Sequence, residues 1–286
     1  MLEKGQIMNY KITNLEYGTG PWGTEMLYGA IGNPKPGETE NNVHSITLLE
    51  DEDGRKILVD TGVDEDDPAK KGLWDSLITE FNGTMSALRL VGLVPEDIDA
   101  VIVTHAHLDH IGALMRFAHA DIYMQREEFE AWERMAADPN YQQLVLPAAF
   151  PPDYPQIRAL IDEGKVNLLE GDVEEVLPGI SLHVVRECHS VAEQLVIVDT
   201  ERGKVIVGGD IACRPANVFG TEDWPGFLVP VLGRSGSARK VCEAYEWIRG
   251  MLAGDASRLV LTHDVTMHER FETEGHEGLA IHYVVR

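Results

Sequence analysis

The sequence predicts an α+β protein, an αββα sandwich in which two mixed β-sheets pack together and helices flank them on the outside. Two hairpin signals support this class, one in each half of the chain. They are the Asp-Glu-Asp-Gly turn at 51–54 and the Thr-Glu-Arg-Gly turn at 200–203, each between two apolar, strand-like segments. Because strand-rich segments recur after a middle helical section, we expect a single domain over residues 1–286.

The individual elements follow from local patterns. The Gly- and Pro-rich stretch up to Glu40 predicts short strands and loops. Apolar residues at helical spacing predict helices, and alternating or continuous apolar runs predict strands. In chain order, we expect strands over 45–50 and 56–60, a helix over 73–91 that ends before Gly92, a strand over 99–104, helices over 127–137 and 157–163, strands over 180–185, 195–199 and 204–208, a helix over 237–252 and a last strand over 258–262.

The charge balance narrows the classes of partner. The chain carries 24 Lys and Arg against 48 Asp and Glu, a formal net charge of −24. Nucleic-acid binding needs clustered positive charge, so this excess of acid argues against it. It also argues against an anionic membrane surface. A small molecule is the expected partner.

Cysteine usage and the lack of sorting signals predict a cytoplasmic protein. The three cysteines, Cys188, Cys213 and Cys242, are widely spaced and form no CxxC pair, which is typical of a reducing compartment. No apolar run approaches the roughly 18 residues that span a bilayer. The first residues, Met1 to Gln6, show no basic segment followed by an apolar one, as a secretory signal would.

One short segment indicates metal chemistry. His105, His107, Asp109 and His110 lie within six residues, directly after the apolar run 100–103. Imidazole nitrogens and carboxylate oxygens are ligands for zinc and similar ions. The two-residue spacing of His105 and His107 lets both face one side of an extended turn, while Asp109 and His110 can face a second ion.

This segment resembles the HxHxDH signature of the metallo-β-lactamase superfamily. Further features of that family occur in the expected order along most of the chain, each at the end of a predicted strand. They are Asp60-Thr-Gly, Cys188-His189-Ser190, Gly208-Gly209-Asp210 and Leu261-Thr262-His263-Asp264.

The resemblance implies a fold and a ligand set. The fold is the αββα sandwich already expected. One divalent ion would take His105, His107 and His189, a second would take Asp109, His110 and His263, and Asp210 would bridge them. Zinc is the expected metal, with iron or manganese as alternatives. In this family a hydroxide shared by the two ions attacks an electrophilic carbonyl. Asp109 would be the catalytic residue that orients the nucleophile and carries a proton. Asp60 would contact a ligating histidine, with a carboxylate that caps the turn as the alternative.

Within the superfamily, the layout is most similar to the N-acyl homoserine lactonase-like group, partly through segment 88–99. The resemblance implies opening of a small lactone or related cyclic ester. Two departures keep alternatives open: Cys213 stands where quorum-quenching lactonases commonly have Tyr, and Glu187-Cys188-His189 replaces their Pro-Gly-His. The alternatives are hydrolysis of a thioester, cyclic amide or aryl ester, or a non-catalytic metal-binding protein.

Candidate substrate-binding residues follow the bridging aspartate. They are Cys213, Phe219 and Trp224, the last two within an apolar cluster that also holds Phe227 and Leu228. Burial of Cys213, and core packing or a homodimer contact for the cluster, are the alternatives. Arg214 is expected either to pair with a substrate carboxylate or to form a surface salt bridge. The remaining histidines, which are His44, His119, His183, His268, His276 and His282, are expected to take surface or core roles.

Overall fold

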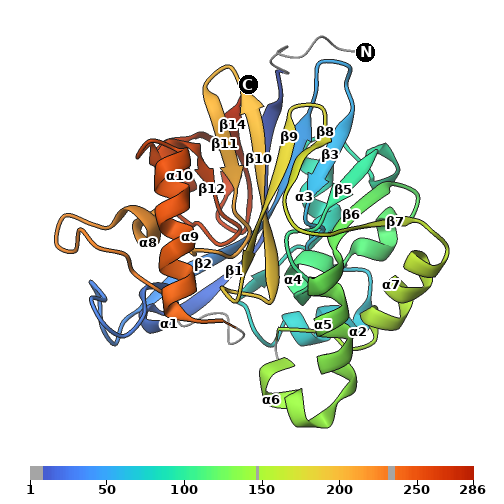
Figure 1. The fold of residues 1–286 in the computed structure, drawn as a ribbon, viewed down its shortest axis with the longest axis horizontal. Coiled ribbons are helices and arrows are strands. Elements are labelled where there is room, and N and C mark those ends of the chain that lie inside the picture. Colours follow the sequence, from blue (N-terminus) through green and yellow to red (C-terminus); the bar gives the residue numbers. More distant parts are fainter. Residues whose placement is uncertain (1–8, 146–147, 231–235) are drawn as a thin grey trace.

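A computed structural model describes residues 9–145, 148–230 and 236–286 (Figure 1). Residues 1–8, which carry the argument about a secretory signal, lie outside this described part. Within it, no helix is both long enough and apolar enough to cross a bilayer.

The larger sheet is mixed. Its strands β1, β2 and β3 pair antiparallel, whereas β3, β5, β6 and β7 follow one another in parallel. The order across the sheet is β13 (Glu272–His276), β14 (Leu279–Val285), β1 (Lys11–Gly23), β2 (Thr39–Glu50), β3 (Lys56–Val59), β5 (Ala100–Ile102), β6 (Asp121–Gln125) and β7 (Val166–Leu169), and β4 (Glu80–Phe81) pairs with β1.

The smaller sheet is mixed as well. Its antiparallel strands continue from the hairpin at Thr200–Gly203, and β12 joins β11 in parallel. The order is β12 (Leu259–Val260), β11 (Gly203–Val207), β10 (Ala192–Thr200), β9 (Ile180–Arg186) and β8 (Val173–Leu177).

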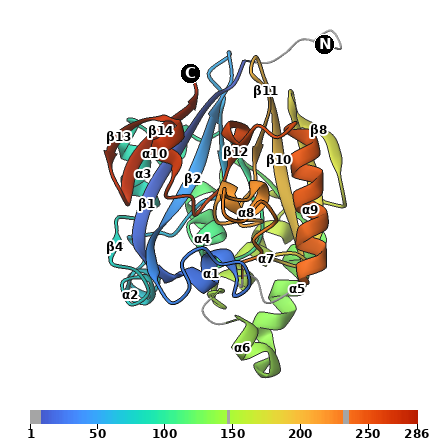
Figure 2. The ribbon, with the colours of Figure 1, turned by 90° about the vertical axis from the view of Figure 1, so that its left-hand side faces the viewer.

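Helices cover the outer faces of both sheets (Figures 1 and 2). Apolar side chains such as Ile57 and Val196 form the core between the sheets. The outer face of the larger sheet packs on α2 (Pro68–Trp74), α3 (Thr84–Leu90), α5 (Arg126–Ala137) and α7 (Asp153–Asp162), and that of the smaller sheet packs on α8 (Pro215–Phe219) and α9 (Ala238–Met251). The short helices are α1 (Thr24–Tyr28), α4 (Leu108–Ile111), α6 (Gln142–Val145) and α10 (Met267–Arg270), with 3₁₀ turns at Pro95–Asp97, Leu114–Phe117, Pro139–Tyr141 and Ala256–Arg258. The αββα prediction is confirmed.

Two local predictions are wrong. The expected helix over 73–91 covers only the last two residues of α2, then strand β4 and the helix α3. Gly83, directly before α3, has a φ of 81°, which a regular α-helix does not contain, so no continuous helix runs through it. The expected short strands before Glu40 are mainly one long strand, β1, because it pairs along its length with β2.

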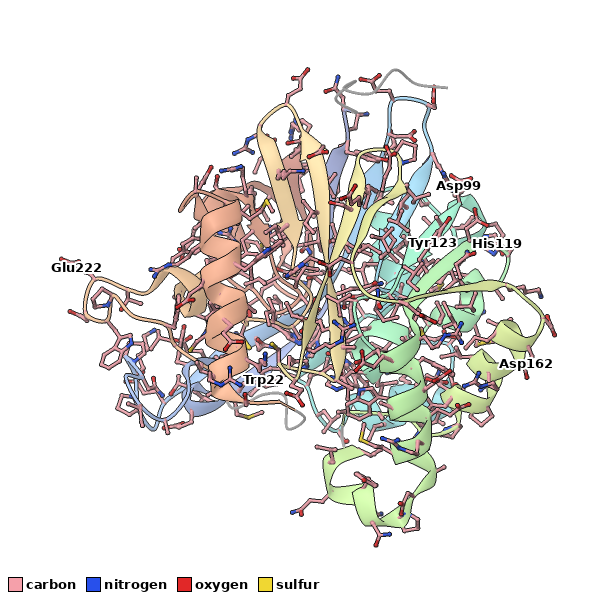
Figure 3. All side chains as sticks on the ribbon, in the orientation of Figure 1. Trp22, Asp99, His119, Tyr123, Asp162 and Glu222 are labelled. Carbon is pink, nitrogen blue, oxygen red and sulfur yellow. The ribbon has the colours of Figure 1, made fainter. Side chains whose placement is uncertain are left out.

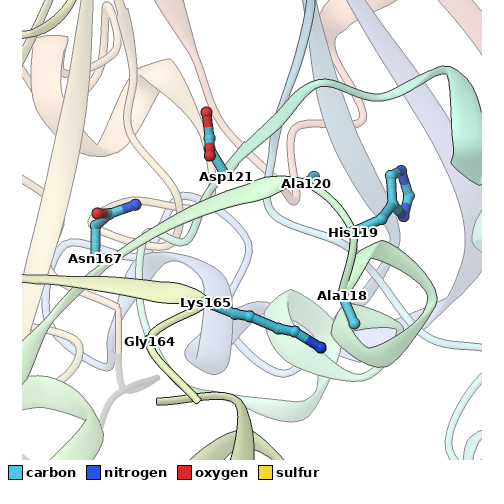
Figure 4. A pocket seen from close by; sticks show the side chains of 7 residues that line it. All are labelled: Ala118, His119, Ala120, Asp121, Gly164, Lys165 and Asn167. Atoms are coloured by element: carbon cyan, nitrogen blue, oxygen red, sulfur yellow. The ribbon is translucent and has the colours of Figure 1, made fainter. Parts of the chain in front are cut away.

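The two ends of the parallel strands differ in what they carry. The motif 105–110 follows the carboxyl end of β5, and loops after β9, β11 and β12 carry His189, Asp210 and His263. A shallow polar pocket lies at the opposite end, where β6 begins and Asp121 pairs with Ala100 (Figure 4). Its lining comprises Ala118, His119, Ala120, Asp121, Gly164, Lys165 and Asn167. Figure 3 shows His119 at the right of the molecule and Trp22 low near its centre.

Candidate metal centre

Four side chains form a first group that could hold an ion. Ligand atoms of His105, His107, His189 and Asp210 all lie within 4.8 Å of one another. His107 Nδ1 is 3.1 Å from His189 Nε2, which in turn is 3.3 Å from Asp210 Oδ2. All four residues are buried. The loops after β5, β9 and β11 therefore converge on one point.

A second group shares Asp210 with the first. Asp109, His110, Asp210 and His263 again place one ligand atom each within 4.8 Å of one another. His263 Nε2 is 3.0 Å from Asp210 Oδ2, and His110 Nε2 is 3.3 Å from Asp210 Oδ1. The structure thus brings together all seven residues that the sequence singled out, in two groups joined by the expected bridging carboxylate.

The chemistry of the donors fits two cations. His105 Nε2, His110 Nε2 and Asp210 Oδ1 are buried and have no hydrogen-bond partner in the described residues. Such orphaned polar atoms are costly unless a ligand completes them. Burial and the neighbouring charge of His110 hold the pKa of His105 well below its usual range, which keeps the imidazole neutral with a free lone pair.

The neighbouring histidines lower the pKa of the two aspartates of the groups. Burial by itself would raise the pKa of Asp210, but His263, His110 and His189 outweigh it and bring that pKa well below its ordinary value. For Asp109 too, burial would raise the pKa, but His110, His44 and His263 together outweigh it and lower the pKa. In return, Asp210 and Asp60 overcome the effect of burial on His110 and raise its pKa. Negative charge is concentrated where the ions would bind.

Asp60 orients histidines of both groups. Its Oδ2 lies 2.7 Å from His110 Nδ1 and accepts a hydrogen bond of 2.8 Å from the Thr104 hydroxyl. The same hydroxyl is 3.1 Å from His105 Nδ1. A carboxylate behind a ligating imidazole fixes the tautomer that leaves Nε2 free for a metal. The expected contact of Asp60 with a histidine of the motif is confirmed for His110, and metal binding by that histidine stays a prediction.

His263 is held by backbone. Its Nδ1 is 2.8 Å from the carbonyl oxygen of Val43, which leaves Nε2 directed at Asp210. Arg214 donates to the carbonyl oxygens of His263, Cys213 and Asn41. Because Arg214 is 1% exposed, the expectation of a surface salt bridge is wrong. Its Nη1 also donates to Asn42 Oδ1, and its pairing with a substrate carboxylate stays a prediction.

The first group is supported by a buried glutamate. Glu128 of α5 accepts hydrogen bonds from the backbone of Ala106 (3.0 Å) and Ala192 (2.7 Å) and from the Ser190 hydroxyl. Trp132 donates to that hydroxyl at 2.8 Å, and its ring centroid lies 4.5 Å from that of His107. These contacts fix the backbone on either side of His105, His107 and His189.

Sequence reasoning missed two further residues at the site. Glu193 Oε1 accepts a hydrogen bond of 2.7 Å from the backbone of Asp210 and lies 3.8 Å from His105 Nδ1. The sequence carried no distinctive signal for Glu193, because β10 also contains the polar residues Gln194, Asp199 and Thr200. A Cβ on Gly209, whose φ is 53°, would come within 2.7 Å of that oxygen, so glycine permits the approach. His44 is the second: it lies in β2, and its Nδ1 is 3.5 Å from Asp109 Oδ2.

The predicted substrate residues lie in apolar surroundings. Cys213 is 1% exposed and packs with Leu27, Tyr28 and Leu228, so its expected alternative, burial, is confirmed. Phe219 packs beneath α9. Trp224 is 39% exposed, and a Cβ on Gly32 would approach its ring to 2.6 Å. A substrate role for Cys213, Phe219 and Trp224 stays a prediction. A different aromatic residue, half-buried Trp22, lies beside the second group, with its ring centroid 4.9 Å from that of His263.

Comparison with known proteins decides the family. The model of the metallo-beta-lactamase superfamily matches residues 40–263, which include every residue of both groups. The chain belongs to this superfamily. Among its relatives, N-acyl homoserine lactonase AiiA of Bacillus thuringiensis subsp. kurstaki is 29% identical over 202 residues, 67% of this chain and 73% of the relative. The N-acyl homoserine lactonase of Bacillus cereus is 30% identical over 190 residues, 63% of this chain and 68% of the relative.

Solved structures share the metallo-β-lactamase fold of this chain. An N-acyl homoserine lactone hydrolase with N-hexanoyl-L-homoserine bound at its catalytic metal centre matches with a TM-score of 0.66 and 23% identity, over 93% of this chain and 98% of that one. The dizinc quorum-quenching lactonase AidC matches with a TM-score of 0.63 and 15% identity, over 98% and 96% of the two chains. At these identities the likeness shows the fold.

Proposed function

We propose that this chain is a dinuclear metal-dependent hydrolase that opens a small lactone or a related cyclic ester. The observation that carries the proposal is the pair of buried metal-binding groups that share Asp210. Membership of the superfamily supports metal-dependent hydrolysis, and the curated lactonase relatives support a lactone as substrate.

The proposed ligand assignment follows the two groups. His105, His107 and His189 would hold one ion, Asp109, His110 and His263 the other, and Asp210 both. When bound, two divalent ions supply a hydroxide nucleophile at neutral pH and polarise the ester carbonyl. Zinc is the proposed metal because imidazole and carboxylate are its common ligands. A chain that binds only one of these two ions would leave one of the two groups empty.

Asp109 is proposed to handle the proton. Its side chain is 12% exposed, whereas the other members of the two groups are buried, which supports Asp109 as the member that an incoming substrate can reach. The Tyr17 hydroxyl donates to its backbone oxygen at 3.0 Å and anchors that turn. An ionised Asp109 can accept the proton of the nucleophile and pass it to the ring oxygen that leaves as an alcohol.

The experiment is a hydrolysis screen run with metal analysis. The purified protein, loaded with zinc or manganese, is tested on lactones with and without N-acyl chains, and on thioesters, cyclic amides and aryl esters. We expect lactone opening at two ions per chain. Activity on a thioester or amide without any lactone activity would refute a lactone as the substrate, while the assignment as a metal-dependent hydrolase would stand. A single-domain organisation over residues 1–286, a homodimer and a cytoplasmic location stay predictions.

A further inference from the structure

His44 is locked in place beside the second group. It lies in the interior of β2 and is 1% exposed. Four rings surround it, at centroid distances of 4.7 Å for His263, 5.1 Å for Trp74, 5.7 Å for Trp22 and 6.0 Å for Tyr17. The imidazole therefore cannot turn out to solvent to satisfy its nitrogens.

Both ring nitrogens of His44 are left without a hydrogen bond of good geometry among the described residues. A neutral imidazole carries one donor and one acceptor, and a buried donor without a partner is destabilising. The oxygen beside it is Asp109 Oδ2, 3.5 Å from His44 Nδ1. A shift of a few tenths of an ångström by either side chain closes this contact into a hydrogen bond.

Asp109 needs a donor of this kind. Its Oδ2 faces His263 Nε2 at 3.5 Å and His110 Nε2 at 3.8 Å. Those nitrogens point into the second group, and their Nδ1 atoms are engaged by Val43 and Asp60. They are therefore metal-facing lone pairs in the loaded protein and cannot donate to the carboxylate. Tyr17 holds only the backbone oxygen of Asp109.

We propose that His44 is a positioning residue for Asp109: its Nδ1–H donates to Asp109 Oδ2 and holds the carboxylate toward the second metal-binding group. This inference rests on the proposed function only for its effect on turnover, since the orientation of Asp109 toward an ion is a property of the site itself. Partners behind metal ligands typically contribute 10- to 100-fold to activity or metal affinity, and we expect about this range.

Two substitutions separate positioning from packing. His44→Phe keeps a ring of similar shape among its aromatic neighbours and removes both nitrogens. His44→Asn loses the ring but retains an amide donor attached at Cγ, as Nδ1 is. Positioning predicts that His44→Phe lowers kcat about 10- to 100-fold with little change in KM, and that His44→Asn recovers most of the loss. If His44 serves only to fill space among the rings, His44→Phe should instead keep a higher kcat than His44→Asn.

A third variant protects the test if His44→Phe does not fold. His44→Gln places its amide at the reach of Nε2 rather than Nδ1, so positioning requires His44→Asn to exceed His44→Gln in kcat. Equal rates for these two amides, or a lower rate for His44→Asn, would overturn the assignment. His119→Phe makes the same chemical change in the surface pocket of Figure 4 and should match the unaltered protein.

The second readout does not depend on a substrate. The protein and its variants are loaded with Co²⁺ alone, and the visible absorption of the bound ion reports the ligand geometry. His44→Phe should shift the cobalt bands, whereas His44→Asn and His119→Phe should leave them close to those of the unaltered protein. Unchanged bands in His44→Phe would contradict the proposal. If His44→Phe shifts the cobalt bands but the unaltered protein opens no lactone, the positioning role of His44 stands and the proposed substrate is refuted.

Discussion

The two metal-binding groups share Asp210 yet are supported in different ways. In the second group, the far nitrogen of each histidine has its own acceptor: Asp60 for His110 and the Val43 carbonyl for His263. In the first group, Glu128 acts on the backbone instead and joins the segments that carry the ligands through Ala106 and Ala192. Each histidine of the second group thus has a direct acceptor of its own. In the first group, His105 reaches Asp60 only through the Thr104 hydroxyl, and Glu128 joins the two loops that carry the ligands.

This difference has a chemical consequence. A direct carboxylate–imidazole contact affects the basicity as well as the direction of the ligand. A backbone contact affects direction alone. The second group also contains Asp109, the proposed proton carrier, so we expect changes to its electrostatics to affect turnover.

The largest expected effect comes from removing what the groups share. Asp210→Ala should abolish stable binding of both ions and lower activity by more than the roughly 100-fold that a supporting partner contributes. His189→Ala and His110→Ala are the matched controls, because each touches one group: the first should lose mainly the first ion and the second mainly the second. Elemental analysis after dialysis measures this. Retention of two ions by Asp210→Ala would contradict the shared ligand.

Asp109→Asn should separate binding from turnover. The amide keeps the shape of the side chain but cannot accept and return a proton, so kcat should fall on the order of 100-fold or more. Metal content should stay close to that of the unaltered protein, since the other ligands remain. Near-full activity with both ions bound would exclude Asp109 as the proton carrier.

Asp60→Asn and Glu128→Gln compare the two kinds of support directly. Asp60→Asn should weaken binding of the second ion by about 10- to 100-fold. Glu128→Gln removes the charge that Ala106, Ala192 and Ser190 share, so it should weaken the first ion and lower the melting temperature. Competition with a chelator gives both affinities. Equal loss of both ions in both variants would erase the distinction between the groups.

Labelling of the cysteine thiols should give a small, local signal of how the first group is supported. Burial raises the pKa of Cys188, next to His189, to about 12. Since the thiolate is the reactive form and an exposed thiol titrates near 8.5, Cys188 should resist iodoacetamide between pH 7 and 9. Half-buried Cys242 should react first. Glu128→Gln should speed labelling of Cys188, and Asp60→Asn should not; mass spectrometry of the labelled peptides distinguishes the two results.

Cys213→Tyr tests the departure from related lactonases. Cys213 is packed among Leu27, Tyr28 and Leu228. A tyrosine there overfills the cluster, and we expect the free energy of unfolding to fall by about 1–3 kcal/mol. If the missing hydroxyl limits turnover of acyl homoserine lactones, this variant should still gain activity on them. A stable variant without such a gain would show that the cysteine does not set the substrate.

The ligands were predictable because they lie close together in the chain or directly after apolar strands. His105 to His110 form one contiguous motif, and His189, Asp210 and His263 each follow a strand. The interruption of the expected helix over 73–91 was not predictable, because the apolar spacing persists across Gly83 while the backbone at Gly83 has a positive φ. Pairing of β4 with β1, far away in sequence, decides that region.

By itself, the sequence indicated the αββα class and the dense histidine motif, because strand periodicity and a short motif are local properties of the chain, and its resemblance to the metallo-β-lactamase superfamily implied the seven candidate ligands and their two sets. Only the tertiary structure decided what stands behind those ligands. Glu128 and Glu193 look like ordinary acidic residues of a helix and a strand, and His44 like one more strand residue. They reach the site because packing of the two sheets and α5 brings them there, and burial gives each polar atom an effect that its position in the sequence does not reveal.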